Sequence, residues 1–234
     1  MPLPTLVVPE YECNLPSGKK VTYRPFLVRE EKLLYVAMES QDQKEMVKAV
    51  KEIIKNCTSV KNVGTLSTFD IELLFLRIRA KSVGEISEFK LTCPDDGKTQ
   101  VDVEVNLEEV DVVIPPDHSK KIRITDDVTL VMKYPSIDTF VKNNLSENPN
   151  IDDVFDLAAD CVDQIATGED VEDAKNYKKA ELVSFFEGMN SQQFAKVQGF
   201  FETMPKLEHT IEVFNPKTEV KSEIKLEGMA AFFE

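Results

Sequence analysis

The chain has 234 residues, of which 42% are hydrophobic and 30% are charged. Together with a mean hydropathy of -0.25, these values exclude an integral membrane protein, a collagen-like fibre and a chain that is disordered throughout. The formal net charge of -14 opposes binding to nucleic acid or to an anionic membrane surface, because both are themselves negatively charged. We therefore expect the partners to be other proteins.

The cysteines and the N-terminal residues indicate where the protein folds. The four cysteines, at positions 13, 57, 93 and 161, are too far apart to form a CxxC pair. The segment 1–10 contains three prolines and no basic residue, so it does not fit a signal peptide. No apolar run approaches the roughly 20 residues that a membrane helix needs. These features predict reduced thiols and a cytosolic location.

The first third of the chain predicts a hairpin followed by three helices. A cluster of Pro, Ser and Gly at 15–19 separates two short strands. The segment 29–40 is predicted to be a helix with one apolar face, formed by Leu33, Leu34, Ala37 and Met38. A second helix is expected to begin after Asp42, which has the spacing of a capping box with Glu45. The third helix is expected to begin near Ser67 or Thr68.

In the middle third of the chain, apolar residues recur at every second position. Apolar residues alternate with polar ones on both sides of a Pro-Asp-Asp-Gly turn at 94–97, which predicts a half-buried hairpin. A strand is predicted over 110–114, and a second hairpin is predicted to join 121–124 to 128–132. Strands are therefore expected to dominate this part.

Helical periodicity returns after Pro135. Ser136 is the expected cap of a short helix, and an apolar stripe from Ile151 to Ile165 predicts a longer helix that ends near Gly168. Helices are also predicted over 178–187 and 191–204, before a final hairpin around 215–218. This order predicts an α+β fold of amphipathic helices with segregated antiparallel β-hairpins. It fits two domains, 1–134 and 135–234, or a single domain.

Residues that could support catalysis are scarce. His118 and His209 are the only histidines, and no GxSxG motif accompanies them, so we expect solvated or edge histidines. The segment Cys93–Gly97 has the form of one zinc-ribbon knuckle, but no second cysteine follows closely. A metal-free hairpin is the preferred interpretation. The sequence predicts no catalytic residues, no cofactor and no metal site.

The segment 143–174 holds ten Asp or Glu residues and no Lys or Arg. Five aspartates fall on the predicted helix there: Asp152, Asp153, Asp156, Asp160 and Asp163. A solvated helix face is one interpretation. A docking surface for a basic protein is another, and a metal-assisted hydrolase is a more remote one.

Phenylalanine occurs 14 times and forms three adjacent pairs. Neighbouring residues on a helix point about 100 degrees apart, so a small core has difficulty burying both members of each pair. Wide buried helix faces are one explanation. A protein contact surface is the other, and its expected residues are Phe200, Phe201, Phe232 and Phe233. This second hypothesis predicts that replacing Phe232 and Phe233 by Ala weakens partner binding and leaves the fold intact.

Four segments, taken in order, carry a resemblance to a known family. They are Leu15–Leu34, Thr68–Arg79, Cys93–Thr99 and Phe200–Leu207. Their sequences resemble the baseplate hub protein family, encoded by gene 26, of T-even-type contractile-tailed bacteriophages and their cyanophage relatives. The resemblance extends over nearly the whole chain, although none of the segments is a catalytic signature.

The resemblance implies a non-enzymatic role in the tail baseplate hub, as a structural subunit or an assembly factor. Other hub and tail proteins are the implied partners, and a homo-oligomer is compatible with this role. A transient chaperone of hub subunits, absent from the mature virion, is the alternative. The implied location is the host cytoplasm during assembly and, for a structural subunit, the virion tail. The resemblance brings no established functional residues.

Overall fold

The computed structural model describes residues 6–144 and 151–232, which fold into two compact units. Unit 1 comprises the described residues within 1–63, 69–113 and 206–234, and unit 2 comprises those within 64–68 and 114–205. The chain passes between the units at 63/64, 68/69, 113/114 and 205/206. After the last of these positions it re-enters unit 1 and forms a strand of its sheet.

Unit 1 contains four helical segments and seven strands. In chain order its described elements are β1 (Tyr11–Asn14), β2 (Lys20–Tyr23), α1 (Val28–Ser40), α2 (Gln43–Cys57), α3 (Thr68–Val83), β3 (Ile86–Thr92), β4 (Gln100–Asn106), β5 (Asp111–Val113), β10 (Lys206–Phe214), β11 (Lys221–Glu227) and the short 3-10 helix η3 (Met229–Phe232). Another short 3-10 helix, η1 (Val63–Thr65), spans the boundary between the units.

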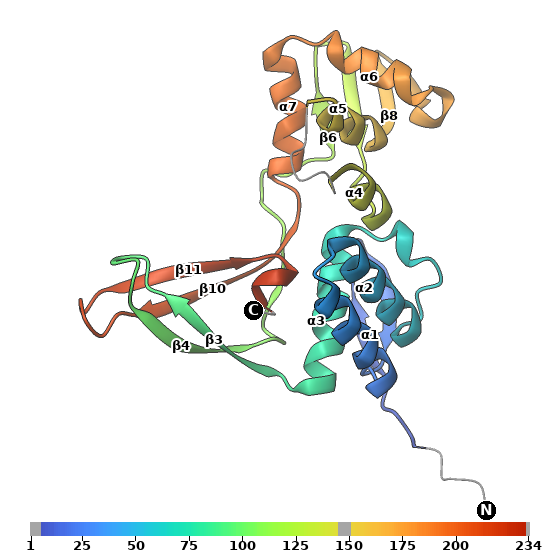
Figure 1. Cartoon of the computed structure of the whole chain (residues 1–234). Helices are drawn as coiled ribbons and strands as arrows, with labels where there is room; N and C mark the ends of the chain where they lie inside the picture. Colours follow the sequence, from blue (N-terminus) through green and yellow to red (C-terminus); the bar gives the residue numbers. More distant parts are fainter. Residues whose placement is uncertain (1–5, 145–150, 233–234) are drawn as a thin grey trace, which may run out of the picture. The chain divides into compact units, whose positions relative to one another are not determined.

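Helix α3 lies in the core of unit 1. Nine of its side chains are buried, including the four predicted to point inward: Ile71, Leu74, Phe75 and Ile78. A helix that is apolar on most sides requires packing partners on most sides. Figure 1 shows α3 beside α1 and α2, with the β3–β4 and β10–β11 hairpins close to each other.

The sheets of unit 1 are small and antiparallel. β1 pairs with β2, β3 pairs with β4, and β10 lies between β11 and β5. The pairing of Lys206 with Val113 and of Glu208 with Asp111 attaches the returning chain to β5. Each predicted hairpin of this unit is therefore confirmed, and the β10–β5 pairing adds a long-range connection.

Unit 2 is built around one four-stranded antiparallel sheet with the order β6-β7-β8-β9. Its described elements are β6 (Lys121–Arg123), β7 (Val128–Met132), α4 (Ile137–Asn144), α5 (Ile151–Asp160), β8 (Val162–Thr167), β9 (Asp170–Asp173), η2 (Ala174–Asn176), α6 (Lys179–Glu187) and α7 (Ser191–Glu202). Apolar side chains from the sheet and from α5, α6 and α7 form one core.

The predicted helix from Ile151 to Ile165 is wrong in its second half. α5 ends at Asp160, and Val162–Thr167 forms β8, which pairs with β7 so that Ile165 lies opposite Leu130. The segment is rich in β-branched residues, which pack well on a pleated sheet. Gly168, with φ 62, then supplies the left-handed backbone of the tight turn into β9. Asp163 consequently lies on a strand and not on the acidic helix.

These elements confirm the predicted α+β class with segregated antiparallel hairpins. Ser136 is confirmed as a cap, since its Oγ accepts a hydrogen bond of 3.1 Å from the backbone N–H of Thr139. None of the described helices is long and apolar enough to cross a membrane.

Candidate interaction surface

Helix α1 exposes most of its apolar side chains. Only Glu30 and Ala37 are buried along its length. The large apolar residues exposed here are Leu27, Val28, Leu33, Tyr35, Val36 and Met38. The face predicted to be buried is therefore only partly so, because Leu33 remains 40% exposed and Met38 remains 52% exposed. Several exposed apolar side chains on one helix are typical of a protein contact surface.

A buried ion cluster fixes the start of α1. The side chain of Glu30 is 1% exposed and accepts hydrogen bonds from Arg24 Nη2 at 3.1 Å and Arg29 Nε at 2.7 Å. It also accepts one from the backbone N–H of Leu27 at 2.8 Å, which caps the helix. Burial alone would raise the pKa of Glu30, but these hydrogen bonds outweigh it and hold the pKa below its ordinary value. Glu30 thus faces inward together with Ala37, while Leu33 and Met38 of the predicted stripe do not.

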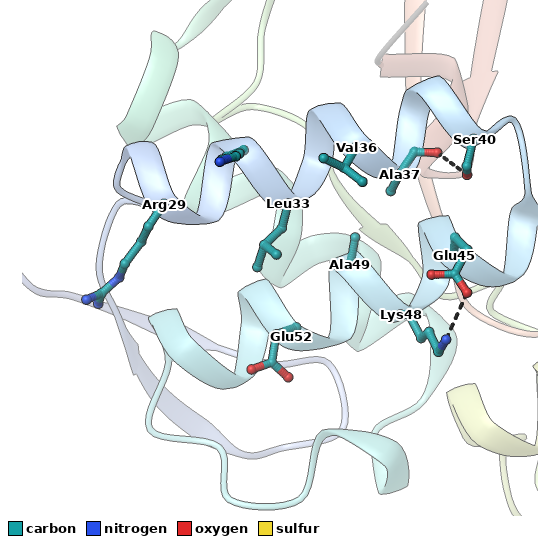
Figure 2. Close-up of a pocket in the computed structure, with 10 residues that line it drawn as sticks. Arg29, Leu33, Val36, Ala37, Ser40, Glu45, Lys48, Ala49 and Glu52 are labelled. Carbon is teal, nitrogen blue, oxygen red and sulfur yellow. Dashed lines mark hydrogen bonds and ion pairs between the residues drawn. The ribbon is translucent and has the colours of Figure 1, made fainter.

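A groove of about 530 Å³ runs between α1 and α2. Figure 2 shows its apolar floor, where Leu33 of α1 and Ala49 of α2 point toward one another beside Ala37. Val36, 58% exposed, forms part of its wall. The groove therefore offers apolar area that water covers in the isolated chain.

The rim of the groove carries charges of opposite sign on its two helices. Arg29 and Lys32 come from α1, while Glu45 and Glu52 come from α2. Lys48 also lies on the α2 side, where its Nζ is 2.8 Å from a carboxylate oxygen of Glu45. The two-residue linker between the helices is short because Gln41 adopts a left-handed conformation, with φ 54. The close packing of the two helices places both sets of charges along one groove.

The acidic helix α5 is partly exposed, and part of its charge is paired. Asp152 is exposed, and Asp153, Asp156 and Asp160 are half-buried. Lys179 of α6 lies between two of these carboxylates, with Nζ–O distances of 3.0 Å to Asp156 and 2.8 Å to Asp160. Burial lowers the pKa of Lys179, but the two hydrogen bonds outweigh it and raise that pKa. Part of the acidic charge thus joins α5 to α6.

The phenylalanines proposed as contact residues have different environments. Phe232 is 0% exposed in the core of unit 1, and Phe200 is 3% exposed in the core of unit 2. Both are therefore core residues, because each packs among aliphatic or aromatic side chains of its own unit. Phe201 is half-buried, and Phe233 lies outside the described residues.

His118 is not the solvated or edge histidine that the sequence indicated. Its Nδ1 and Nε2 lie 3.0 Å from Thr203 Oγ1 and from Tyr134 Oη, respectively. Since the Thr203 hydroxyl donates to the carbonyl of Gly199 at 2.7 Å, its oxygen is left to accept from Nδ1–H. The Tyr134 hydroxyl then donates to Nε2. Burial and the nearby Lys120 lower the pKa of His118, so the neutral ring is the favoured form.

The turn that resembles a zinc knuckle is held by hydrogen bonds. Cys93 is buried, and its backbone N–H donates to the carbonyl of Thr99 at 2.7 Å. Asp96 accepts from the backbone N–H groups of Lys98 and Thr99 at 3.0 and 2.9 Å. Within 6–144 and 151–232, no group of three or more His, Cys, Asp or Glu side chains is placed to hold a metal ion.

These features define an α+β protein with an apolar helical surface suited to binding another protein. The family model described as "T4 bacteriophage base plate protein" matches residues 8–234, and the chain belongs to this family. Searches of curated proteins and of solved structures found no match. Membership implies a structural role in the phage baseplate, contacts with other baseplate proteins and a location in the virion tail.

Proposed function

We propose that the chain is a non-enzymatic protein of the baseplate hub, either a structural subunit or an assembly factor. The observation that carries this proposal is the apolar surface of α1 and its groove with α2, found on a member of a base plate family. Buried apolar area supplies most of the driving force for protein association. The four hub-like segments of the sequence support the hub as the specific place of action.

Two surfaces are proposed to make the contacts. The α1–α2 groove supplies apolar area, and the acidic face of α5, led by the exposed Asp152, supplies electrostatic selection. Clustered carboxylates attract a basic partner and repel an acidic one. Phe201, half-buried on α7, remains a proposed contact residue, and Phe233, which lies outside the described residues, remains a second one.

A transient chaperone of hub subunits is the alternative. The exposed apolar side chains of α1 favour this role as well, since a chaperone must bind apolar surfaces and then release them. Both roles place the chain in the host cytoplasm during tail assembly. They differ in whether the chain stays in the finished particle.

Complementation of a phage that lacks this gene tests the proposal. The chain, supplied in trans, should restore tails with complete baseplates, and Val36→Asp should reduce their yield. Val83→Asp, at a residue 64% exposed on α3 and outside the groove, is the matched control and should restore them fully. Normal baseplates in the complete absence of the chain would contradict the proposal.

A further inference from the structure

The α1–α2 helical pair exposes apolar side chains and also carries no net charge. Residues 28–57 contain six Lys or Arg and six Asp or Glu, although the whole chain carries a net charge of -14. The rest of the chain therefore holds the entire negative excess. Two copies of such a protein repel one another over most orientations, and this helical pair is a place where they meet without that repulsion.

Exposed apolar residues are concentrated in α1 and at its start. Six of the sixteen large apolar side chains that are exposed among the described residues belong to the short segment 27–38. Leu33 and Val36 are the ones that line the groove, together with the small residues Ala37 and Ala49. Small residues in the floor leave room for side chains of an opposing helix.

When two copies of the chain are related by a two-fold rotation, the rim charges of one copy can face rim charges of opposite sign on the other. A rotation about an axis parallel to the two helices brings α1 of one copy over α2 of the other. Arg29 and Lys32 of each copy then face the α2 side of the second copy. Figure 2 shows Glu52 on the same stretch of the groove as Leu33, which is next to Lys32 in sequence. The rotation thus brings Lys32 toward Glu52 of the second copy, twice. Within its own copy Glu52 lies 3.8 Å from Lys55 Nζ, so Lys32 would join an existing ion pair.

We propose that the occupant of this groove is a second copy of the chain, and that the two copies form a dimer with a four-helix interface. In this arrangement Leu33 and Val36 of each copy are buried against the helices of the other. A dimer covers the groove, so contacts of the dimer with hub proteins fall to the acidic face of α5 and to Phe201. The inference goes beyond the proposed function and does not depend on it, because it concerns the purified chain alone.

Light scattering during size-exclusion chromatography tests the dimer directly. At a concentration of about 100 µM the purified full chain should have twice its 26.5 kDa mass. Val36→Asp should give the monomer mass, because it places a charge in the apolar wall, and Val83→Asp should leave the dimer intact. Circular dichroism checks that each variant is folded. A wild-type monomer, or a Val36→Asp dimer as stable as wild type, overturns the proposal.

A charge exchange tests the arrangement. Lys32→Glu and Glu52→Lys, each alone, place like charges at both symmetric contacts and should weaken the dimer about 10-fold or more. An equal mixture of the two variants should form a heterodimer, because each contact then joins opposite charges. Failure of the mixture to associate more tightly than either variant alone overturns the α1-on-α2 arrangement. A chain that stays monomeric and binds only another baseplate protein through this groove also overturns the proposal.

Discussion

The buried amide of Asn215 donates to both carboxylate oxygens of Asp95, with Nδ2–O distances of 3.1 and 3.0 Å. The two residues lie in the turns of different hairpins, β10–β11 and β3–β4, and are far apart in the sequence. The Thr218 hydroxyl donates to the same carboxylate. These hydrogen bonds, led by that from Thr218, hold the pKa of Asp95 below its ordinary value. Asn215, Thr218 and Asp95 thus form a polar cluster that joins the turns of the two hairpins in unit 1.

Asn215→Ala should destabilise unit 1 by about 1 to 3 kcal/mol, since it removes the hydrogen bonds of an amide that is only 1% exposed. Urea unfolding followed by circular dichroism measures this loss. Lys217→Ala in the same turn is the control, because the Lys217 side chain is exposed and its backbone N–H donor to Asn215 remains. Equal stability of the two variants would show that the cluster contributes nothing.

Phe232→Ala should cost about 3 to 5 kcal/mol, because the ring is 0% exposed among core residues of unit 1 and its removal leaves a cavity. This outcome differs from the sequence hypothesis that the residue is a surface anchor whose loss spares the fold. Phe214→Ala is the matched control, since that ring is 51% exposed and should matter little. Thermal unfolding compares them, and a Phe232→Ala chain as stable as the control would place the ring outside the core.

Glu72 of α3 should make unit 1 more stable in acid. Burial raises its pKa to about 7, although the hydrogen bond from the Met229 backbone N–H opposes the rise. Because the folded pKa lies above the ordinary value of 4.5, the stabilisation is complete below pH 4.5 and is lost as the pH rises through 7.

Glu72→Gln should therefore unfold at higher urea concentration than wild type at pH 8, and this difference should disappear near pH 4. Glu39→Gln, at an exposed position on α1, should show no such dependence on pH. A Glu72→Gln difference that is the same at both pH values would refute the buried-carboxylate explanation.

His118 should make unit 2 less stable in acid, which is the opposite of the effect of Glu72 on unit 1. Its folded pKa is below the ordinary value of 6.5, so its stabilisation is complete above pH 6.5 and is lost as the pH falls toward the folded pKa. The protection of the backbone amides of β6 to β9 against hydrogen exchange, measured relative to the intrinsic exchange rate at each pH, should fall in mild acid, and His118→Gln should remove this component. His209→Gln, in unit 1, serves as control. Unchanged acid sensitivity in His118→Gln would assign the effect to other groups.

Local patterns predicted most of the elements. The turn residues marked four hairpins correctly but not the β8–β9 hairpin, and the capping residues Asp42 and Ser136 marked helix starts. The segment 162–167 was mistaken for helix because its apolar spacing also fits a helix. Its identity as a strand depends on pairing with β7, whose partner residues lie 30 to 39 positions away in sequence.

The surface was harder to predict. The periodicity of 29–40 predicted the helix correctly. Which face of that helix is buried, however, is set by Glu30 and the two arginines that contact it. An acidic residue in that pattern is ordinarily assigned to solvent, so the groove with α2 could not be derived from hydrophobic spacing. The Phe pairs were similarly ambiguous, because burial of Phe232 depends on long-range packing of α3 with the hairpins.

Of the two proposed roles, membership of the base plate family favours the structural one, and we therefore propose that the chain is a structural part of the baseplate hub. Quantitative mass spectrometry of purified phage particles, beside hub intermediates from infected cells, tests it most directly by counting this chain against a known hub subunit. We expect a fixed ratio of copies of this chain to copies of that subunit in the finished particle. Presence in the intermediates alone would contradict the structural role in favour of the chaperone, and absence from both would contradict a hub role altogether.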